Sequence, residues 1–468
     1  MNPAGWVTAS LVIVAACGSV AGHSGADASG PDVMSCTADV ACTTNPGAPC
    51  VTGKTVCAGG PRCVDDAPAP DGTACGSGLC ALGDCLPPTT IATDVDLSTT
   101  VVSAGRTCAE APSYSVTSAP SSTSVTVATA PAGDCLVAGD EILLINLQGV
   151  RGATPNVGNW ELLRVASVAG ALITFTSART RFYGATAGAD DNLGIAAASQ
   201  KVAVVRVPRF GATSIAPGKR VTTAVWDGAK GGVFAIRAAR LAINGTIDVS
   251  AAGYRAGRWS QDGSACTVNV ATESGESIDG PPVASTAHHA GAAGGIAAAS
   301  APTFNANTPL SASAGHATAG QPGMSSDGRV VGEPGAAYGN ADASTLTLGS
   351  GSSGNITCNP TGDPNGQLIG GSTRGSGIIA VFAGDISVAA GTLVATPSDA
   401  SRDVASSGGY VYLRGANVDL GAGRVTARGG TAHGAAPGGK SNVAGNGYVV
   451  VHASGTVTGT SDPAVRRL

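Results

Sequence analysis

Two arginines, one histidine and two aromatic residues occupy matching positions in four glycine-led segments, where they could form a ligand-binding surface. Arg237, Phe382, Arg414 and His452 hold the same position in successive segments, and Tyr412 holds the position of the neighbouring outward row. Arginines beside an aromatic ring can hold sugars or acidic polymers through stacking and charge. The alternative is that a long glycine-rich insertion covers this face and buries Phe382.

The segments that carry these residues read as β-strands. Each begins with glycine and then alternates apolar with small or polar residues, over 231–247, 377–393, 408–425 and 447–457. Alternation is the strand period, because successive side chains point to opposite faces. A recurring unit of this kind buries its apolar face by stacking on its neighbours, which predicts a parallel β-helix or β-solenoid. The residues expected to point inward are Phe234, Ile236, Ile379, Val381, Val411, Leu413, Val449 and Val451.

The rest of the chain divides by composition. Residues 91–225 contain further alternating segments and predict a small β-sandwich or barrel-like domain ahead of the β-helix at 226–468. Residues 254–374 are rich in Gly, Ala, Ser and Pro, and we expect a lateral excursion without its own core. The expected fold class is all-β, with a disulfide-rich segment at the N-terminal side.

The N-terminus has the features of a targeting segment. Residues 6–16 form an apolar run that is too short to span a bilayer. The sequence Val14-Ala15-Ala16-Cys17-Gly18 resembles the lipobox of bacterial lipoproteins, which implies a signal peptide at 1–16 and lipid attachment at Cys17. The resemblance also implies an exported protein held at the outer membrane or cell surface by its lipid. An ordinary secretory signal is the alternative.

Cysteine usage points to the same compartment. Of thirteen cysteines, eight lie between Cys36 and Cys85, and no Cys-x-x-Cys occurs. Disulfides are therefore favoured over a zinc ribbon, and residues 17–90 are interpreted as a cysteine-rich stalk and linker or a protein-binding module. Cys108 could pair with Cys135, and Cys266 with Cys358. The candidates for disulfides are Cys36, Cys42, Cys50, Cys57, Cys63, Cys75, Cys80, Cys85, Cys108, Cys135, Cys266 and Cys358.

Several longer motifs carry a resemblance to known proteins. The stretches 139–149, 158–163, 226–253 and 338–351 resemble glycine-rich and cysteine-rich bacterial surface lipoproteins with β-helix-type repeats. Some of these proteins are described as haemagglutinin-like or gliding-motility-associated. The resemblance implies a cell-surface location, and its motifs are mostly structural.

Charge and chemistry exclude several functions. The net charge is −5 and no basic cluster occurs, so nucleic-acid binding is not expected. His316 lies in a small-residue stretch that we predict to be mobile, and no cofactor, metal site or catalytic motif is expected. Asp248, Asp385 and Asp419 are single carboxylates at different repeat positions. The sequence therefore favours a non-enzymatic surface lipoprotein, structural or adhesive, that contacts polysaccharide or surface proteins. The alternatives are a polysaccharide lyase or hydrolase, and a scaffold subunit of an envelope or motility assembly.

Overall fold

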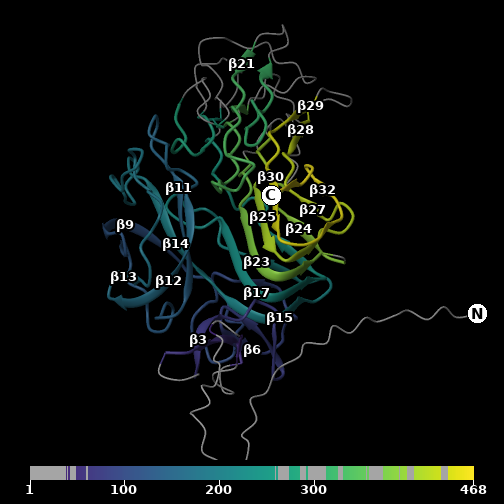
Figure 1. The fold of residues 1–468 in the computed structure, drawn as a ribbon. Coiled ribbons are helices and arrows are strands. Elements are labelled where there is room, and N and C mark those ends of the chain that lie inside the picture. The colour runs from purple at the N-terminus through teal and green to yellow at the C-terminus, as the bar shows by residue number, and fades with distance from the viewer. Residues whose placement is uncertain are drawn as a thin grey trace, which may run out of the picture.

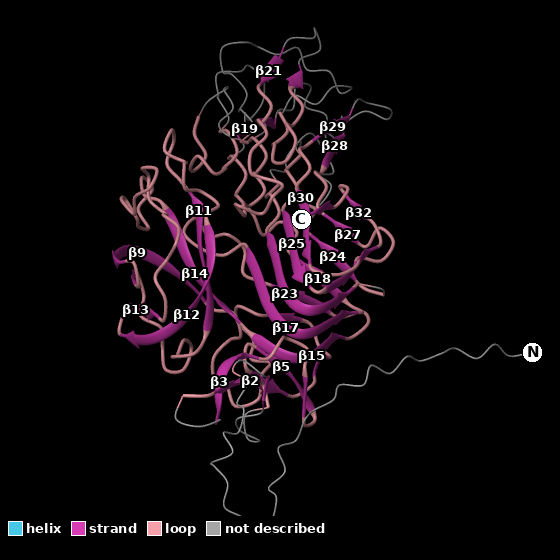
Figure 2. Cartoon of the chain, in the orientation of Figure 1, coloured by secondary structure: helices cyan, strands magenta, loops and turns pink. Residues whose placement is uncertain are grey.

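The computed structural model is built from β-strands, and its described part contains no helix (Figure 2). It describes residues 38, 41–42, 49–58, 62–258, 260–261, 273–284, 291–292, 312–324, 330–354, 356–357, 373–388, 390–397, 405–433 and 441–468. Within these residues no helix is long and apolar enough to cross a membrane. The all-β expectation is confirmed.

Two parallel sheets form the centre of the molecule (Figure 1). In the described residues, six repeats each supply strands to both sheets, with a short break between the strands of one repeat. The first sheet contains β7 (Thr89–Ile91), β15 (Arg209–Ile215), β17 (Val233–Ile243), β23 (Ile378–Ser387), β25 (Tyr410–Gly415), β26 (Asn417–Asp419), β30 (Tyr448–Ala453), β31 (Val457–Thr458) and β33 (Arg466–Arg467). The second sheet contains β8 (Val95–Asp96), β16 (Arg220–Thr222), β18 (Thr246–Asp248), β24 (Thr392–Val394), β27 (Val425–Thr426) and β32 (Ser461–Asp462).

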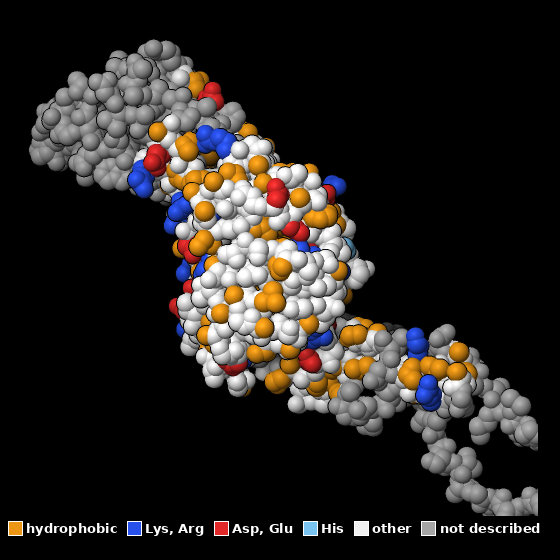
Figure 3. Space-filling model, turned by 90° about the vertical axis from the view of Figure 1, so that its left-hand side faces the viewer, with side chains coloured by type: hydrophobic (Ala, Val, Ile, Leu, Met, Phe, Trp, Pro, Cys, Tyr) orange, Lys and Arg blue, Asp and Glu red, His pale blue; other side chains and the backbone are white. Residues whose placement is uncertain are grey.

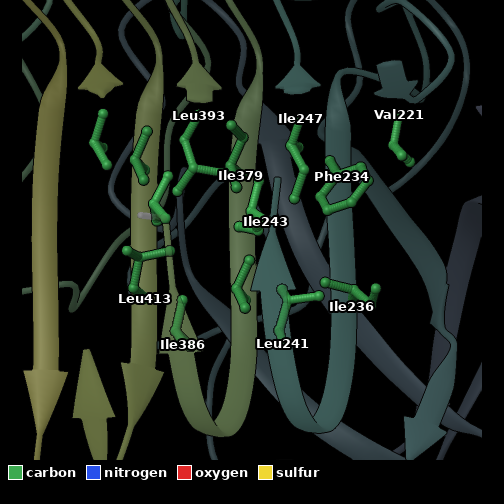
Figure 4. Close-up of a cluster of buried hydrophobic side chains, with 14 of the residues drawn as sticks. Val221, Phe234, Ile236, Leu241, Ile243, Ile247, Ile379, Ile386, Leu393 and Leu413 are labelled. Carbon is green, nitrogen blue, oxygen red and sulfur yellow. The ribbon is translucent and has the colours of Figure 1, made fainter. Parts of the chain in front are cut away.

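The core between the two sheets contains the side chains that the alternation predicts to point inward (Figure 4). Phe234 pairs in register with Ile379, Ile379 with Val411, and Val411 with Val449. All eight predicted inward residues belong to this buried cluster, together with Ile247, Leu393 and Val425 from the second sheet. A strand that alternates apolar and small residues thus supplies one rung of a continuous apolar stack.

A closed barrel of antiparallel strands interrupts the repeats. Its strands run in the order β10 (Ser124–Val127), β13 (Leu172–Phe175), β12 (Trp160–Ala169), β11 (Glu141–Gln148), β14 (Lys201–Val207) and β9 (Ser113–Ser121). The expected boundary at 91–225 is wrong at both ends. The segments Thr89–Asp96 and Arg209–Thr222 pair within the parallel sheets, so the barrel is inserted between the first and second repeats. β7 and β15 follow Pro88 and Pro208 rather than a glycine, so the glycine-led pattern did not mark these segments as repeats.

The cysteine-rich region folds into two small sheets. The first contains β1 (Ala41–Cys42), β2 (Val51–Val56) and β3 (Arg62–Pro68), and the second contains β4 (Ala74–Cys75), β5 (Gly78–Ala81) and β6 (Asp84–Leu86). Disulfides link Cys50 to Cys80 and Cys75 to Cys85. Both β5 and β6 lie against β15, and β5 also contacts β17, so the second small sheet docks on the first parallel sheet.

Other cysteines are described only in part. The predicted Cys108–Cys135 disulfide is present, and Cys57 and Cys63 are also disulfide-bonded. Cys42 lies in β1, but its side chain is outside the described residues. Cys17, Cys36, Cys266 and Cys358 fall outside the described residues as well, so their predicted roles stay predictions.

Within 254–374, the described glycine-rich segments are ordered and pack against one another. Together with their neighbours they form what we call the glycine layer: residues 253–257, 273–277, 312–316, 349–354, 373–377, 405–409 and 444–447. The segment 349–354 bonds to two neighbouring segments through four of its amides. The amides of Gly349 and Ser352, three residues apart, donate to the carbonyls of Ser376 and Thr373. The amides of Gly351 and Gly354, also three residues apart, donate to the carbonyls of Glu276 and Glu273. Three residues per turn is the period of a polyproline II helix, so these segments pack as polyproline II-type rods rather than as strands.

Glycine is required in this layer because the rods pack backbone against backbone. A Cβ at Gly351 would overlap the carbonyl of Arg255, and one at Gly375 would overlap the carbonyl of Gly349. Neither glycine has a positive φ, so crowding rather than backbone conformation selects it. A pattern search for apolar alternation cannot detect such packing, because the rods bury small side chains and backbone.

The remaining strands are short. They are β19 (Ser260–Gln261), β20 (Gly323–Met324), β21 (Val330–Gly332), β22 (Ile356–Thr357), β28 (Thr431–His433) and β29 (Ser441–Val443). They form three separate two-stranded sheets: β19 with β22, β20 with β21, and β28 with β29.

Candidate functional site

The expected ligand face exists as a row of side chains with the predicted register. Arg237 pairs with Phe382, Phe382 with Arg414, and Arg414 with His452 along the first sheet. Tyr412 stands in the adjacent position, opposite Ala380 and Val450. The strand period therefore placed these residues on one outward face.

The barrel covers most of this face. Phe382 and Tyr412 are only 1% and 3% exposed, because Trp160 of β12 packs against both rings at centroid distances of 6.1 and 5.5 Å. The indole Nε1 of Trp160 donates to the carbonyl of Ala343 at 2.9 Å. The expectation that these two aromatic residues form an open ligand surface is thus corrected. The cover is mainly the barrel, and the glycine-rich excursion contributes its edge at 343–348.

Arg237 is occupied by protein carboxylates. Its Nε and Nη2 donate to both oxygens of Glu141 in the barrel at 2.7 and 2.8 Å, and its Nη1 donates at 3.2 Å to Asp71, in the turn between the two cysteine-rich sheets. The guanidinium carbon lies 5.4 Å from the ring centroid of Phe382. Burial by itself lowers the pKa of Arg237, but the Glu141 and Asp71 carboxylates outweigh it and raise that pKa. Arg237 therefore joins three parts of the molecule and is not available to a ligand.

Arg414 and His452 remain at the surface. Both are exposed at the ends of β25 and β30, beyond the area that the barrel covers. The barrel side of the molecule carries basic and acidic side chains interspersed among uncharged groups (Figure 3). Two of the five predicted ligand residues are thus accessible, without the aromatic partners that the proposed stacking required.

The single carboxylates of the repeats are engaged in local contacts. Asp248 accepts from Arg220 at 2.8 Å, and Asp385 accepts from Asn417 at 3.0 Å and from Arg240 at 3.3 Å. Asp419 accepts from the hydroxyl of Thr458 at 2.9 Å and from the amide of Gly421 at 3.1 Å. These bonds run mainly between successive repeats and stabilise their stacking.

His316 is fully buried, which corrects the expectation of a mobile context. Its Nδ1 lies 2.6 Å from the carbonyl oxygen of Gly408 and its Nε2 lies 2.8 Å from the hydroxyl of Thr347. The ring stacks at 4.6 Å on Tyr338 and meets Tyr448 edge-on at 5.2 Å. Burial lowers the pKa of His316 to about 4, against a smaller opposing effect of the Gly408 carbonyl. His316 thus pins the glycine layer to the first sheet as a neutral imidazole.

Three sulfur atoms lie close enough to suggest a metal site. The Sγ atoms of Cys50, Cys75 and Cys85 all lie within 4.8 Å of one another. Each of these sulfurs already belongs to a disulfide, and two disulfides packed side by side account for the cluster. Disulfide sulfurs lack the thiolate charge that binds zinc.

A shallow groove of about 650 Å³ lies on the outer face of the second sheet. Because Leu393 and Val425 point into the core, their neighbours Val394 and Thr426 point outward into the groove. Its lining residues are Ser250, Val394, Thr396, Pro397, Gly423, Thr426, Arg428 and Asp462. The last repeats therefore present a polar depression on a rigid sheet.

The sequence alone did not reveal the groove, because the glycine-led pattern marks only the long first strand of each repeat. The outward row of the second sheet does have a sequence signal, which is the alternation in the short strands after the glycine breaks. Equivalent positions of β18, β24, β27 and β32 hold Asp248, Val394, Thr426 and Asp462. The depression itself has no sequence signal, because its walls come from the segments that connect the strands.

Comparison with known proteins adds little. No protein-family model and no curated protein matches the chain. Among solved structures, it is similar to the tailspike protein gp49 from Pseudomonas phage LKA1, with 12% sequence identity, 74% of this chain covered and a TM-score of 0.15. The chain spans 61% of the tailspike chain. At this TM-score the similarity supports no statement about the fold or function of this chain.

Proposed function

We propose that the two parallel sheets form a parallel β-helix and that the protein is a non-enzymatic, lipid-anchored component of the bacterial cell surface that adheres to polysaccharide. Cys17 is the proposed lipid attachment site. In this proposal the β-helix is a stiff support, and the cysteine-rich sheets connect it to the anchored N-terminus.

The observation that carries the proposal is the junction at Arg237. One guanidinium bonds Glu141 of the barrel and Asp71 in the turn between the two cysteine-rich sheets, while Arg209 and Asp84 form a second ion pair between β15 and β6 at 2.5 Å. The cysteine-rich sheets lie at one end of the molecule and the glycine layer at the other (Figure 1). A protein built this way firmly connects an anchor at its N-terminal end to exposed repeats some distance away, which suits an adhesive scaffold.

A binding and turnover assay tests the proposal. Purified full-length protein is incubated with neutral and acidic polysaccharides, and both co-sedimentation and the release of reducing or unsaturated ends are recorded. Binding without released ends is the expected result. Released ends would replace the adhesive function with a lyase or hydrolase activity, and the absence of any binding would favour a scaffold for protein partners.

Anchoring is tested separately in cells. Replacement of Cys17 by Ser should release the protein from the membrane fraction, while Cys42→Ser, at another N-terminal cysteine, should leave it there. Retention of Cys17→Ser in the membrane fraction would contradict lipid attachment at this residue.

A further inference from the structure

The groove on the second sheet differs from the rest of that sheet in how its polar groups are bonded. Toward the N-terminal repeats, the face bonds to itself: Thr222 donates to the carbonyl of Asp248 at 2.8 Å, and the hydroxyls of Thr246 and Thr392 lie 2.9 Å apart. Arg220 neutralises Asp248 at 2.8 Å. The side chains of this part of the face are thus bonded to other groups of the protein.

Within the groove, three comparable groups have no protein partner among the described residues. In the part of the chain that the structure describes, no hydrogen bond or ion pair forms with the hydroxyls of Ser250 and Thr426 or with the carboxylate of Asp462. Asp462 is exposed, whereas Ser250 and Thr426 are half-buried in the groove wall. The carboxylates of Asp248, Asp385 and Asp419 are all bonded, in contrast to that of Asp462.

The geometry of the groove points to an extended ligand. Val394, Thr426 and Asp462 stand on three successive strands, which repeat at about 4.8 Å in a β-sheet. This spacing is of the same order as one sugar unit in a linear polysaccharide. Thr396 and Arg428 lie two residues after Val394 and Thr426 and form a second row, in which the amide of Arg428 donates to the Thr396 hydroxyl at 3.2 Å.

The chemistry of the lining selects the class of ligand. The hydroxyl groups can donate to and accept from a chain of sugar hydroxyls, and the carboxylate can accept from them, while Val394 and Pro397 offer a small apolar surface for the face of a ring. Arg428 and Asp462 give the lining one positive and one negative charge, so the groove has no net charge that would favour an acidic polymer. We therefore propose that this groove, through Ser250, Thr426 and Asp462, binds a segment of a neutral, linear polysaccharide. This inference rests on the proposed adhesive function and assigns its binding site.

Isothermal titration calorimetry on the full-length protein tests the assignment. The probes are cellohexaose, chitohexaose and maltohexaose as neutral chains, and hexagalacturonate as an acidic chain. Thr426→Val and Asp462→Ala should each weaken the binding of a neutral hexasaccharide about tenfold, because each removes from the groove one group that forms a hydrogen bond with the ligand. The matched controls are Thr246→Val on the same sheet and Asp385→Ala on the first sheet, which should change affinity by less than about twofold.

The outcomes separate the site from the function. Neutral-chain binding that survives both groove substitutions would overturn the assignment of the groove and leave the adhesive function intact. The failure of the wild-type protein to bind any of the four hexasaccharides or the polysaccharides above would overturn both. Binding of hexagalacturonate that strengthens in Asp462→Ala would show that the groove takes acidic chains, and it would overturn the assignment to a neutral polymer.

Discussion

Acidification should loosen the contact between the glycine layer and the first sheet through a single buried histidine. The pKa of His316 is about 4 in the folded protein, because burial disfavours its charged form, whereas an exposed histidine has a pKa near 6.5. The unfolded chain therefore binds more protons than the folded chain between these two values. Stability from this residue is complete above about pH 6.5 and is lost as the pH falls toward 4.

The size of the effect follows from the two pKa values. A shift of one pKa unit corresponds to about 1.4 kcal/mol, so the difference lowers the free energy of unfolding by about 2 kcal/mol at pH 5 and by about 3 kcal/mol at pH 4. The nearest aromatic neighbours do not titrate in this range, because burial raises the pKa of both Tyr338 and Tyr448. The loss therefore belongs to the imidazole itself.

Urea unfolding of the wild type and of His316→Gln at pH 7, 5 and 4 measures this loss. Glutamine has no proton to gain, so the variant should lose less stability on acidification than the wild type, by the amounts given above. Protonation of the carboxylates occurs in both proteins and cancels in the comparison. His452→Gln is the matched control, because it removes an exposed imidazole instead of a buried one.

Two results would refute this reasoning. One is an equal loss of stability in the wild type and in His316→Gln between pH 7 and pH 4. The other is an NMR titration of the His316 ring that gives a pKa near the value of an exposed histidine, since that would mean that water reaches the ring in the folded protein.

The other predictions concern the junction and the packing of the rods. Arg237→Ala leaves the buried Glu141 without its partner and should cost about 3–5 kcal/mol in urea unfolding. The double variant Arg237→Met/Glu141→Met should cost clearly less, and an equal cost for both proteins would argue against a buried charge as the cause. Gly351→Ala places a methyl group against the Arg255 carbonyl and should cost about 1–3 kcal/mol or more. Gly194→Ala, where the added carbon meets only the Ser199 side chain at 3.1 Å, is the control and should cost less than about 1 kcal/mol. Equal melting temperatures for these two glycine variants would show that the backbone around the Arg255 carbonyl moves to accept the methyl group at little cost.

The inward row of the first sheet followed from the sequence by itself. Side chains alternate between two faces along a strand, so the apolar positions around Phe234, Ile379, Val411 and Val449 had to share one side once the strands were parallel. Glycines at the start of each segment marked where the repeat begins, and that common reference set the register. The Cys108–Cys135 bond also followed, because the two residues stand apart from the other cysteines.

What covers each face was decided by the tertiary structure. Phe382 and Tyr412 point outward as the alternation requires, yet they are buried because Trp160 arrives from a barrel that the chain inserts between its first two repeats. His316 lies in a stretch of small residues that looks mobile, and it is fixed by rods that bond to one another every third residue. Periodicity is a property of one segment and can be read along it. Burial depends on which distant segment packs against it, and the sequence carries no local sign of that partner.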